Sequence, residues 1–169
     1  MYEHLHDNKT LPFPDNILHE IGIDTVTPRA RRLYGRLISN KIISDRDASI
    51  LELYYDKQLT LKNIGEEYDV TRERIRQRME IAICRLKKCY SYLASDRYDK
   101  FFEFSFYGNP HVVVNIITIA RSKRAATNWM KSNDSTSVYY DLDMTVIVKN
   151  ITETEYLEKL KYKLDNPRK

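Results

Sequence analysis

Apolar positions between residues 27 and 93 recur every three or four residues, the period of helices packed on a common core. A helix start is predicted at Thr27-Pro28, because a capping hydroxyl precedes proline at the first helical position. This helix should run to about Asn40. Another start is predicted at Ser44, where Asp47 completes a variant of the capping box. The inward positions expected for the two helices are Ala30, Leu33, Tyr34, Leu37, Ile38, Ile50, Leu51, Leu53 and Tyr54.

Residues 60–86 hold two helical patterns, one short and one long, with a break at Asp69-Val70 between them. Gly65 lies inside the short pattern, where glycine costs about 1 kcal/mol, so a close packing contact is expected there. Asp69 is expected near the left-handed region, which a short polar side chain tolerates. The long pattern starts at Thr71 as a helix cap and predicts one apolar stripe of about six turns. The stripe consists of Ile75, Met79, Ala82, Ile83, Leu86, Tyr90 and Leu93.

After about Ala94 the pattern changes from helical period to alternation. Phe102, Phe104 and Phe106 alternate with polar residues, which predicts a strand. The β-branched run at 111–119 predicts a second strand, with a helix starting at Pro110 as the alternative. Unbroken alternation from 138 to 148 predicts a third strand, after a loop at 133–136. Helices are predicted at 122–131 and 153–164.

These elements predict a mixed fold, an N-terminal helical bundle with a helix-turn-helix followed by a small α+β domain. We expect an N-terminal arm over residues 1–26, with a short helix from Asp15 to Ile21. The helix-turn-helix domain is expected over 27–94, and the α+β domain over 97–165.

The charge distribution indicates a nucleic-acid ligand more clearly than the net charge of +4 does. Between Thr71 and Lys88 the chain carries seven cationic and two acidic residues. The seven are Arg72, Arg74, Arg76, Arg78, Arg85, Lys87 and Lys88, and an earlier predicted helix adds Arg29, Arg31, Arg32 and Arg36. Clustered cations displace counterions from a phosphate backbone, so we expect binding that weakens with salt.

Other function classes receive little support from composition. The longest apolar stretch, Val112–Ala120, is too short to span a bilayer, and the acidic start with Glu3 and Asp7 does not have the pattern of a signal peptide. We therefore expect a cytoplasmic protein without a membrane contact. Cys84 and Cys89 are expected as free thiols, and no metal site or cofactor is predicted.

The run TLKNIGEEYDVTRERIRQ at residues 60–77 resembles region four of the bacterial primary sigma factors, the promoter-reading module. TRERIRQ is its most specific part, and the resemblance extends over about Thr27 to Leu93. It implies a fold of about four helices, contact with the minus-35 promoter element, and docking on the flap of core RNA polymerase. The chain departs from the family at Asp69, where glycine is usual, and at Arg78, where an apolar residue is usual.

The resemblance carries DNA-reading roles onto individual residues of the second helix. Arg72, Glu73 and Gln77 correspond to positions that reach base edges, and these side chains can pair with guanine, cytosine and adenine respectively. Arg74 and Arg76 correspond to positions nearer the phosphate backbone. Arg78 either extends outward along the surface or reaches a phosphate. The predicted DNA-binding set is Thr71, Arg72, Glu73, Arg74, Arg76, Gln77 and Arg78.

Asp141 and Asp143 form an Asp-x-Asp-x-Thr run with Thr145 that could hold Mg²⁺ for phosphoryl transfer. Phosphatases of the haloacid dehalogenase type carry such a run just after a buried strand. Here the alternation continues beyond it, so the pair should lie within a strand, on a solvated face.

The function predicted from the sequence is a non-enzymatic transcription regulator that binds promoter DNA, core polymerase, or both. An accessory regulator is expected, phage-borne or acting with a split partner, because residues before Thr27 are too few for the start-melting domain of a complete sigma factor. The alternative is an interaction protein that mimics region four on polymerase or a sigma factor without reading DNA sequence. Residues 97–165 would then bind a second protein or associate with themselves.

Overall fold

The computed structural model describes residues 11–108, 112–142 and 144–167. It divides into two compact units, Met1–Ala94 and Ser95–Lys169, which are called here the helical unit and the sheet unit. The described residues of the first unit form helices without strands, and the second unit combines helices with an antiparallel sheet, so the predicted fold class is confirmed. The start of the predicted N-terminal arm, residues 1–10, lies outside the described residues.

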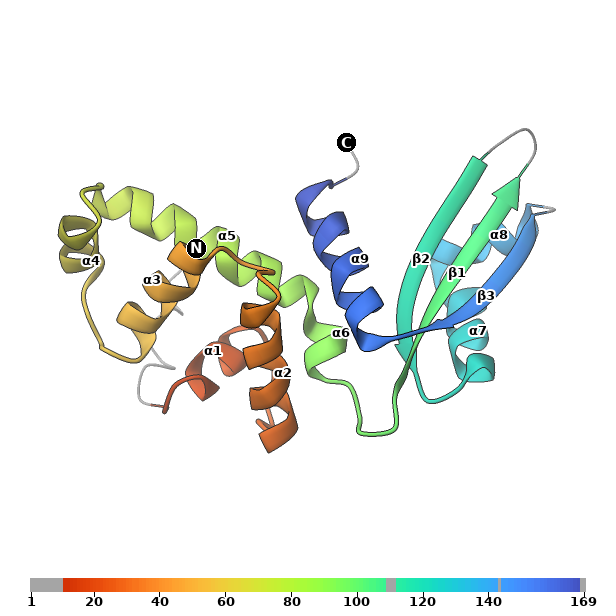
Figure 1. Ribbon diagram of the computed structural model, residues 1–169, viewed down its shortest axis with the longest axis horizontal. Helices are drawn as coiled ribbons and strands as arrows, with labels where there is room; N and C mark the ends of the chain where they lie inside the picture. Colours follow the sequence, from red (N-terminus) through yellow and green to blue (C-terminus); the bar gives the residue numbers. More distant parts are fainter. Residues whose placement is uncertain (1–10, 109–111, 143, 168–169) are drawn as a thin grey trace. The chain divides into compact units, whose positions relative to one another are not determined.

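The helical unit is shown in Figure 1, and its helices that begin at Pro28, Asp45, Leu61 and Arg72 each start at a hydroxyl cap. The hydroxyl of Thr27 accepts the Ala30 N–H, and those of Ser44, Thr60 and Thr71 act in the same way one turn ahead. The predicted starts at Thr27, Ser44 and Thr71 are confirmed. The elements are α1 (Asp15–Glu20), α2 (Pro28–Ser39), α3 (Asp45–Tyr55), α4 (Leu61–Glu67), α5 (Arg72–Lys88) and α6 (Tyr90–Leu93).

Helix α1 belongs to the core of the helical unit although it lies within the predicted arm. Ile17 and Leu18 are fully buried, and the buried side-chain amide of Asn16 donates a 3.0 Å hydrogen bond to the backbone carbonyl of Tyr55 in α3. The same core contains residues from α2 to α6, namely Leu37, Ile50, Leu51, Ile64, Ile75, Leu86 and Tyr92.

The apolar stripe predicted for the long helix is wrong at one position. Helix α5 ends at Lys88, and the N–H of Cys89 bonds back to the Leu86 carbonyl at 2.9 Å. This tight closing turn changes the direction of the chain before α6. Tyr90 is therefore 46% exposed, whereas Tyr92 takes the buried position that the helical period assigned to Tyr90.

The sheet unit contains three antiparallel strands in the order β2-β1-β3 among its described residues. At the centre of the sheet, Phe104 pairs with Ile116 on β2 and with Val148 on β3. The strands predicted around Phe104 and over 111–119 are confirmed from Val112 on, and residues 109–111, including Pro110, lie outside the described residues. The elements are β1 (Lys100–Gly108), β2 (Val112–Ala120), α7 (Lys123–Ser132), α8 (Asp134–Asp141), β3 (Thr145–Ile151) and α9 (Glu153–Asp165).

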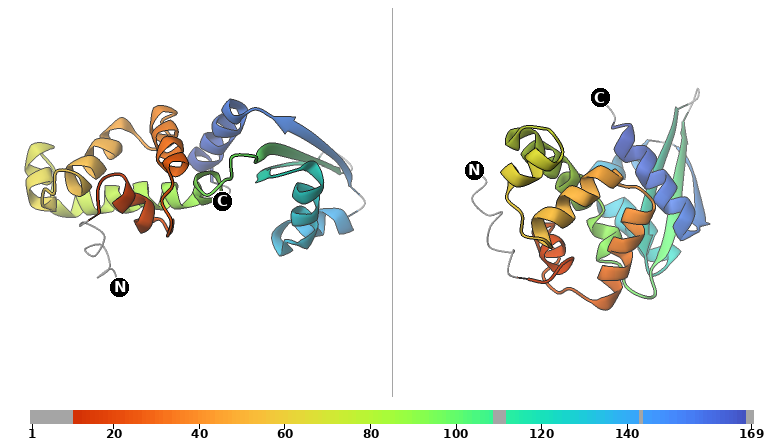
Figure 2. Two further views of the ribbon diagram at one scale, coloured as in Figure 1. Left: turned by 90° about the horizontal axis from the view of Figure 1, so that it is seen from below. Right: turned by 60° about the vertical axis from the view of Figure 1, so that its left-hand side comes forward.

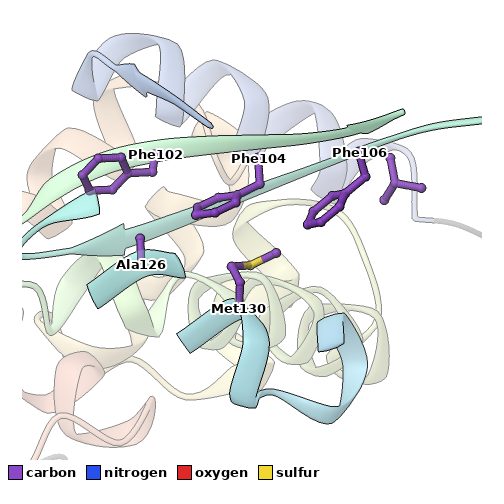
Figure 3. Close-up of a cluster of buried hydrophobic side chains, with 6 residues drawn as sticks. Phe102, Phe104, Phe106, Ala126 and Met130 are labelled. Atoms are coloured by element: carbon purple, nitrogen blue, oxygen red, sulfur yellow. The ribbon is translucent and has the colours of Figure 1, made fainter. Parts of the chain in front are cut away.

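Helices cover both faces of this sheet (Figure 2). On one face, Phe102, Phe104 and Phe106 pack on Ala126 and Met130 of α7 (Figure 3), and two α8 tyrosines pack against the same cluster. On the other face, the ring of Tyr156 in α9 lies 5.0 Å from that of Phe101, and Lys159 forms a 2.8 Å ion pair with Glu103. Successive side chains of β1 therefore pack alternately against α7 and α8 on one face and against α9 on the other.

The third predicted strand is wrong in its first half, as is the loop predicted at 133–136. Residues 134–141 form helix α8, and the strand begins only at Thr145. The side chain of Asn133 caps this helix, and the hydroxyl of Thr136 donates a 2.6 Å hydrogen bond to the Met130 carbonyl. These caps and the packing on the phenylalanine cluster override the alternating pattern. Asp141 ends α8, so it lies on no strand face, and Asp143 lies outside the described residues.

Candidate nucleic-acid interface

Helices α4 and α5 form a helix-turn-helix whose turn requires Gly65 and tolerates Asp69. The N–H of Val70 donates a 2.9 Å hydrogen bond to the Gly65 carbonyl, which brings the turn against α4. A Cβ atom on Gly65 would lie 2.7 Å from the Val70 carbonyl oxygen. The predicted close contact is therefore confirmed, and the contacting group is the backbone of the turn. Asp69 has a φ of 51°, the expected left-handed conformation.

Helix α5 is fixed on the bundle by its apolar side and presents its polar side to solvent. Ile75 is fully buried, as is Ile64 on α4. At 100° per residue, Glu73 and Gln77 lie nearly opposite the buried stripe, and both are exposed. The hydroxyl of Thr71 accepts the N–H of Arg74 at 3.2 Å, so the helix starts where the sequence predicts it.

A network of hydrogen bonds joins the polar residues on this exposed face. Both carboxylate oxygens of Glu73 accept from Arg76, at 2.9 and 2.7 Å, and one also accepts from Gln77 at 3.2 Å. Arg76 reaches Glu80 as well, so its guanidinium lies along the helix between two carboxylates. The hydrogen bond from Arg76 holds the pKa of Glu73 below its usual value. Glu73 is therefore an ionised acceptor with a fixed orientation.

Arg72 and Arg74 are the exposed cations at the start of α5. The guanidinium of Arg74 lies 3.4 Å from the side-chain oxygen of Gln77. Across the described ranges, neither arginine has a carboxylate within ion-pairing distance. Both charges can therefore meet an anionic ligand without first breaking an ion pair.

Arg78 is directed onto α3, away from the other polar residues of α5. Its guanidinium lies 2.7 Å from a carboxylate oxygen of Asp47 and 3.4 Å from the Ser44 hydroxyl. The two ionic side chains are only 24% and 17% exposed. Arg78, one of the predicted DNA-binding residues, is thus engaged by the fold in an interhelical contact.

Arg46 is a residue at this site that the sequence patterns did not single out. Its guanidinium lies 5.0 Å from the ring centroid of Tyr68, at the end of α4, and it donates a 3.5 Å hydrogen bond to the Tyr68 carbonyl. This contact ties α3 to the end of α4, just before the turn. The two residues lie 22 positions apart, so no local signal could identify the pair.

Of the arginines that the sequence places on α2, Arg31 forms a contact within the helical unit. Arg31 forms two 2.7 Å hydrogen bonds with the carboxylate of Asp15 on α1. This contact lowers the pKa of Asp15 below its usual value. Arg31 therefore ties α1 to α2, and its charge is already balanced.

The described residues also bear on metal binding, membrane insertion and thiol chemistry. No group of three or more His, Cys, Asp or Glu residues within the described ranges could hold a metal ion. None of the helices in those ranges has the length and apolarity needed to cross a bilayer. Cys84 is exposed and Cys89 is buried, both as free thiols, and burial raises the pKa of Cys89 to about 12.

Comparison with protein-family models identifies the helix-turn-helix. Residues 41–88 match the family described as Sigma-70, region 4, and this range contains α3, α4 and α5. The helical unit therefore contains a sigma-70 region 4 module, a non-enzymatic DNA-binding helix-turn-helix of transcription proteins, and the resemblance is confirmed over that range. Neither the curated proteins nor the solved structures provide a match to the chain.

Proposed function

We propose that this protein is a transcription regulator that binds duplex promoter DNA by placing the start of α5 in the major groove. The proposed target is an element of the minus-35 type. The observation that supports this most directly is the pair Arg72 and Arg74, both exposed and without a carboxylate partner in the described structure, beside the outward-facing Glu73 and Gln77. A helix start with this mixture of donors and acceptors suits the base edges of a major groove.

The proposed roles are those that the resemblance to region 4 implies for each position of α5. Arg72, Glu73 and Gln77 read base edges, with arginine donating to guanine, glutamate accepting from cytosine and glutamine pairing with adenine. Arg74 contacts a phosphate and sets the register of the helix on the duplex. Arg76 corresponds to a second phosphate position and has to exchange its ion pairs with Glu73 and Glu80 to reach it. Thr71 begins the helix that carries them. Arg78, paired with Asp47, positions α5 on α3 and contributes no phosphate contact.

Core RNA polymerase is the proposed protein partner, through its flap. Support comes from the region 4 match over residues 41–88, since the resemblance to that module implies docking on the flap. Co-purification tests this part separately from DNA binding. Tagged full-length protein should retain core polymerase after the recognition-helix substitutions Arg72→Ala and Gln77→Ala, because the flap contact does not depend on base reading. Failure to retain polymerase with the unsubstituted protein would remove this partner.

DNA reading is tested by selecting duplexes from a random pool with the full-length protein and measuring affinity by fluorescence anisotropy. The double variant Arg72→Ala, Gln77→Ala should bind the selected duplex at least about tenfold more weakly, since each lost bidentate contact costs about 1–3 kcal/mol. Lys161→Ala in the sheet unit serves as a cation-removal control and should bind nearly as the parent does. Undiminished binding by the double variant would favour the interaction protein that mimics region 4 without reading DNA.

A further inference from the structure

A second group of cations gathers at one end of the sheet unit, called here the cationic end. Its members are contributed by two separate parts of the chain. Register places Lys100, the first residue of β1, opposite Ala120, the last residue of β2. Arg121 follows directly and forms a 3.3 Å ion pair with Asp96, which precedes β1. The cationic end therefore consists of Arg97, Lys100, Arg121, Lys123 and Arg124.

The acidic residues at this end, Asp96 and Asp99, form hydrogen bonds and an ion pair within the turn that leads into β1. The N–H of Asp96 donates a 2.6 Å hydrogen bond to the carboxylate of Asp99. The carboxylate of Asp96 accepts the N–H of Arg97 with one oxygen and pairs with Arg121 through the other. Within the part of the chain that the structure describes, no carboxylate lies at ion-pairing distance from Arg97, Lys100, Lys123 or Arg124.

These four charges do not contribute to the core of the sheet unit. All four side chains are exposed, so none supports the core. Lys123 and Arg124 occupy the first turn of α7, which has no acidic residue, and cations near the start of a helix oppose its dipole. Tyr98, between two of the cationic residues, is 73% exposed. Uncompensated cations around one exposed aromatic residue are typical of a surface that meets phosphates.

We propose that the cationic end binds the phosphate backbone of duplex DNA next to the element read by α5, an inference that rests on the proposed function. Arg97 follows the end of α6 by four residues, and α6 directly follows α5. The cationic end is therefore tethered to α5 by a short stretch of chain. A tethered second contact adds affinity without adding sequence preference, because phosphates carry no base identity. A protein surface is disfavoured as the ligand, since the core of such an interface is depleted in charge.

The test measures the salt dependence of DNA binding by the full-length protein, from about 0.05 to 0.2 M salt, with charge-matched variants. The first variant is Lys123→Gln with Arg124→Gln. The control is Lys131→Gln with Lys161→Gln, which removes two cations from other parts of the sheet unit. For the first variant, the slope of log affinity against log salt should decrease in magnitude by about 1.8, and affinity should fall roughly tenfold, equally for selected and unrelated duplexes. The control should keep the parent slope.

The recognition-helix variant Arg72→Ala, Gln77→Ala separates this inference from the proposed function. If it loses sequence preference, while the cationic-end variant loses affinity and salt dependence but keeps its sequence preference, both statements are supported. If the cationic-end variant keeps the parent slope, or changes no more than its control, the inference is overturned and DNA reading by α5 still stands. If α5 proves dispensable but the cationic-end variant loses binding, DNA reading by α5 is overturned, and with it the placement of the phosphate contact beside an element that α5 reads. If the parent protein binds no duplex at any salt, both are overturned.

Discussion

The guanidinium of Arg78 lies 2.7 Å from the carboxylate of Asp47, so helix α5 is held on α3 by an ion pair. An apolar residue is usual at the position of Arg78 in the family that the module resembles. The substitution by arginine is accommodated because Asp47 lies in the first turn of α3, where a carboxylate also suits the helix dipole. Arg78, which the sequence predicts as a DNA-binding residue, thereby forms a structural contact between α5 and α3.

This pair predicts a loss of stability without a loss of DNA reading. Arg78→Ala should lower the free energy of unfolding by about 1 kcal/mol, and a double-mutant cycle with Asp47→Ala should give a coupling of about 0.5–1 kcal/mol. Urea unfolding followed by circular dichroism measures both quantities. DNA affinity of Arg78→Ala should change less than about threefold, well below the loss expected for Arg72→Ala. The opposite ranking would return Arg78 to the DNA contacts.

Two glycines on helices should respond to alanine in opposite directions. Gly65→Ala should destabilise the helical unit by about 1–3 kcal/mol, because its Cβ would lie 2.7 Å from the Val70 carbonyl oxygen. Gly35→Ala in α2 should stabilise it by about 0.5–1 kcal/mol, because a Cβ there meets nothing within 4 Å and alanine favours helix. Thermal unfolding of both variants provides the measurement. Equal effects would show that the α4 turn does not pack as described.

The two cysteines should differ in reactivity in the native state. Cys84 is exposed, whereas burial raises the pKa of Cys89 to about 12, so the reactive thiolate form of Cys89 is disfavoured at neutral pH. A chromogenic disulfide reagent should titrate one thiol at once and the second only after denaturant is added. Cys84→Ser should remove the fast reaction, and Cys89→Ser should leave it. Two fast thiols in the parent would contradict the burial of Cys89.

The ion pair between Asp15 and Arg31 predicts a specific response to acid. Because hydrogen bonds from Arg31 lower the folded-state pKa of Asp15, its contribution to stability is present above its unfolded value of about 3.9. The contribution disappears as the pH falls from there through the lower folded-state pKa.

Asp15→Asn should therefore be less stable than the parent at neutral pH, and the difference should shrink in that acidic range. Asp24→Asn, at an exposed position outside this ion pair, is the control and should match the parent throughout. A difference that persists unchanged at low pH would mean that Asp15 does not act through its charge.

Local sequence signals predicted the helical unit because its determinants are short in range. Each determinant acts over a few residues. These determinants are the caps at Thr27, Ser44 and Thr71, the left-handed residue Asp69 and the close contact at Gly65. The same locality placed Arg72, Glu73 and Gln77 on the exposed side of α5.

Contacts distant in sequence account for the position of Arg78 and, together with a local cap, for helix α8, two places where the structure differs from these predictions. Arg78 and Ser44 are 34 residues apart, so no period could direct Arg78 toward α3. Residues 138–141 alternate as a strand does, but the cap at Asn133 and packing of Tyr139 and Tyr140 on Phe106 make them helical. In that segment, tertiary contacts decide between two structures that the alternation alone cannot separate.

The most direct test of base reading by α5 is the preference at single base pairs, measured with Gln77→Ala. Affinities of the parent and the variant should be compared on the selected duplex and on every single-base-pair substitution of it. Base reading predicts that Gln77→Ala loses about 1–3 kcal/mol of discrimination at one A·T pair and keeps the parent preferences elsewhere. Unchanged preferences at every position, or uniform weakening across all duplexes, would contradict the claim that the start of α5 reads sequence in the major groove.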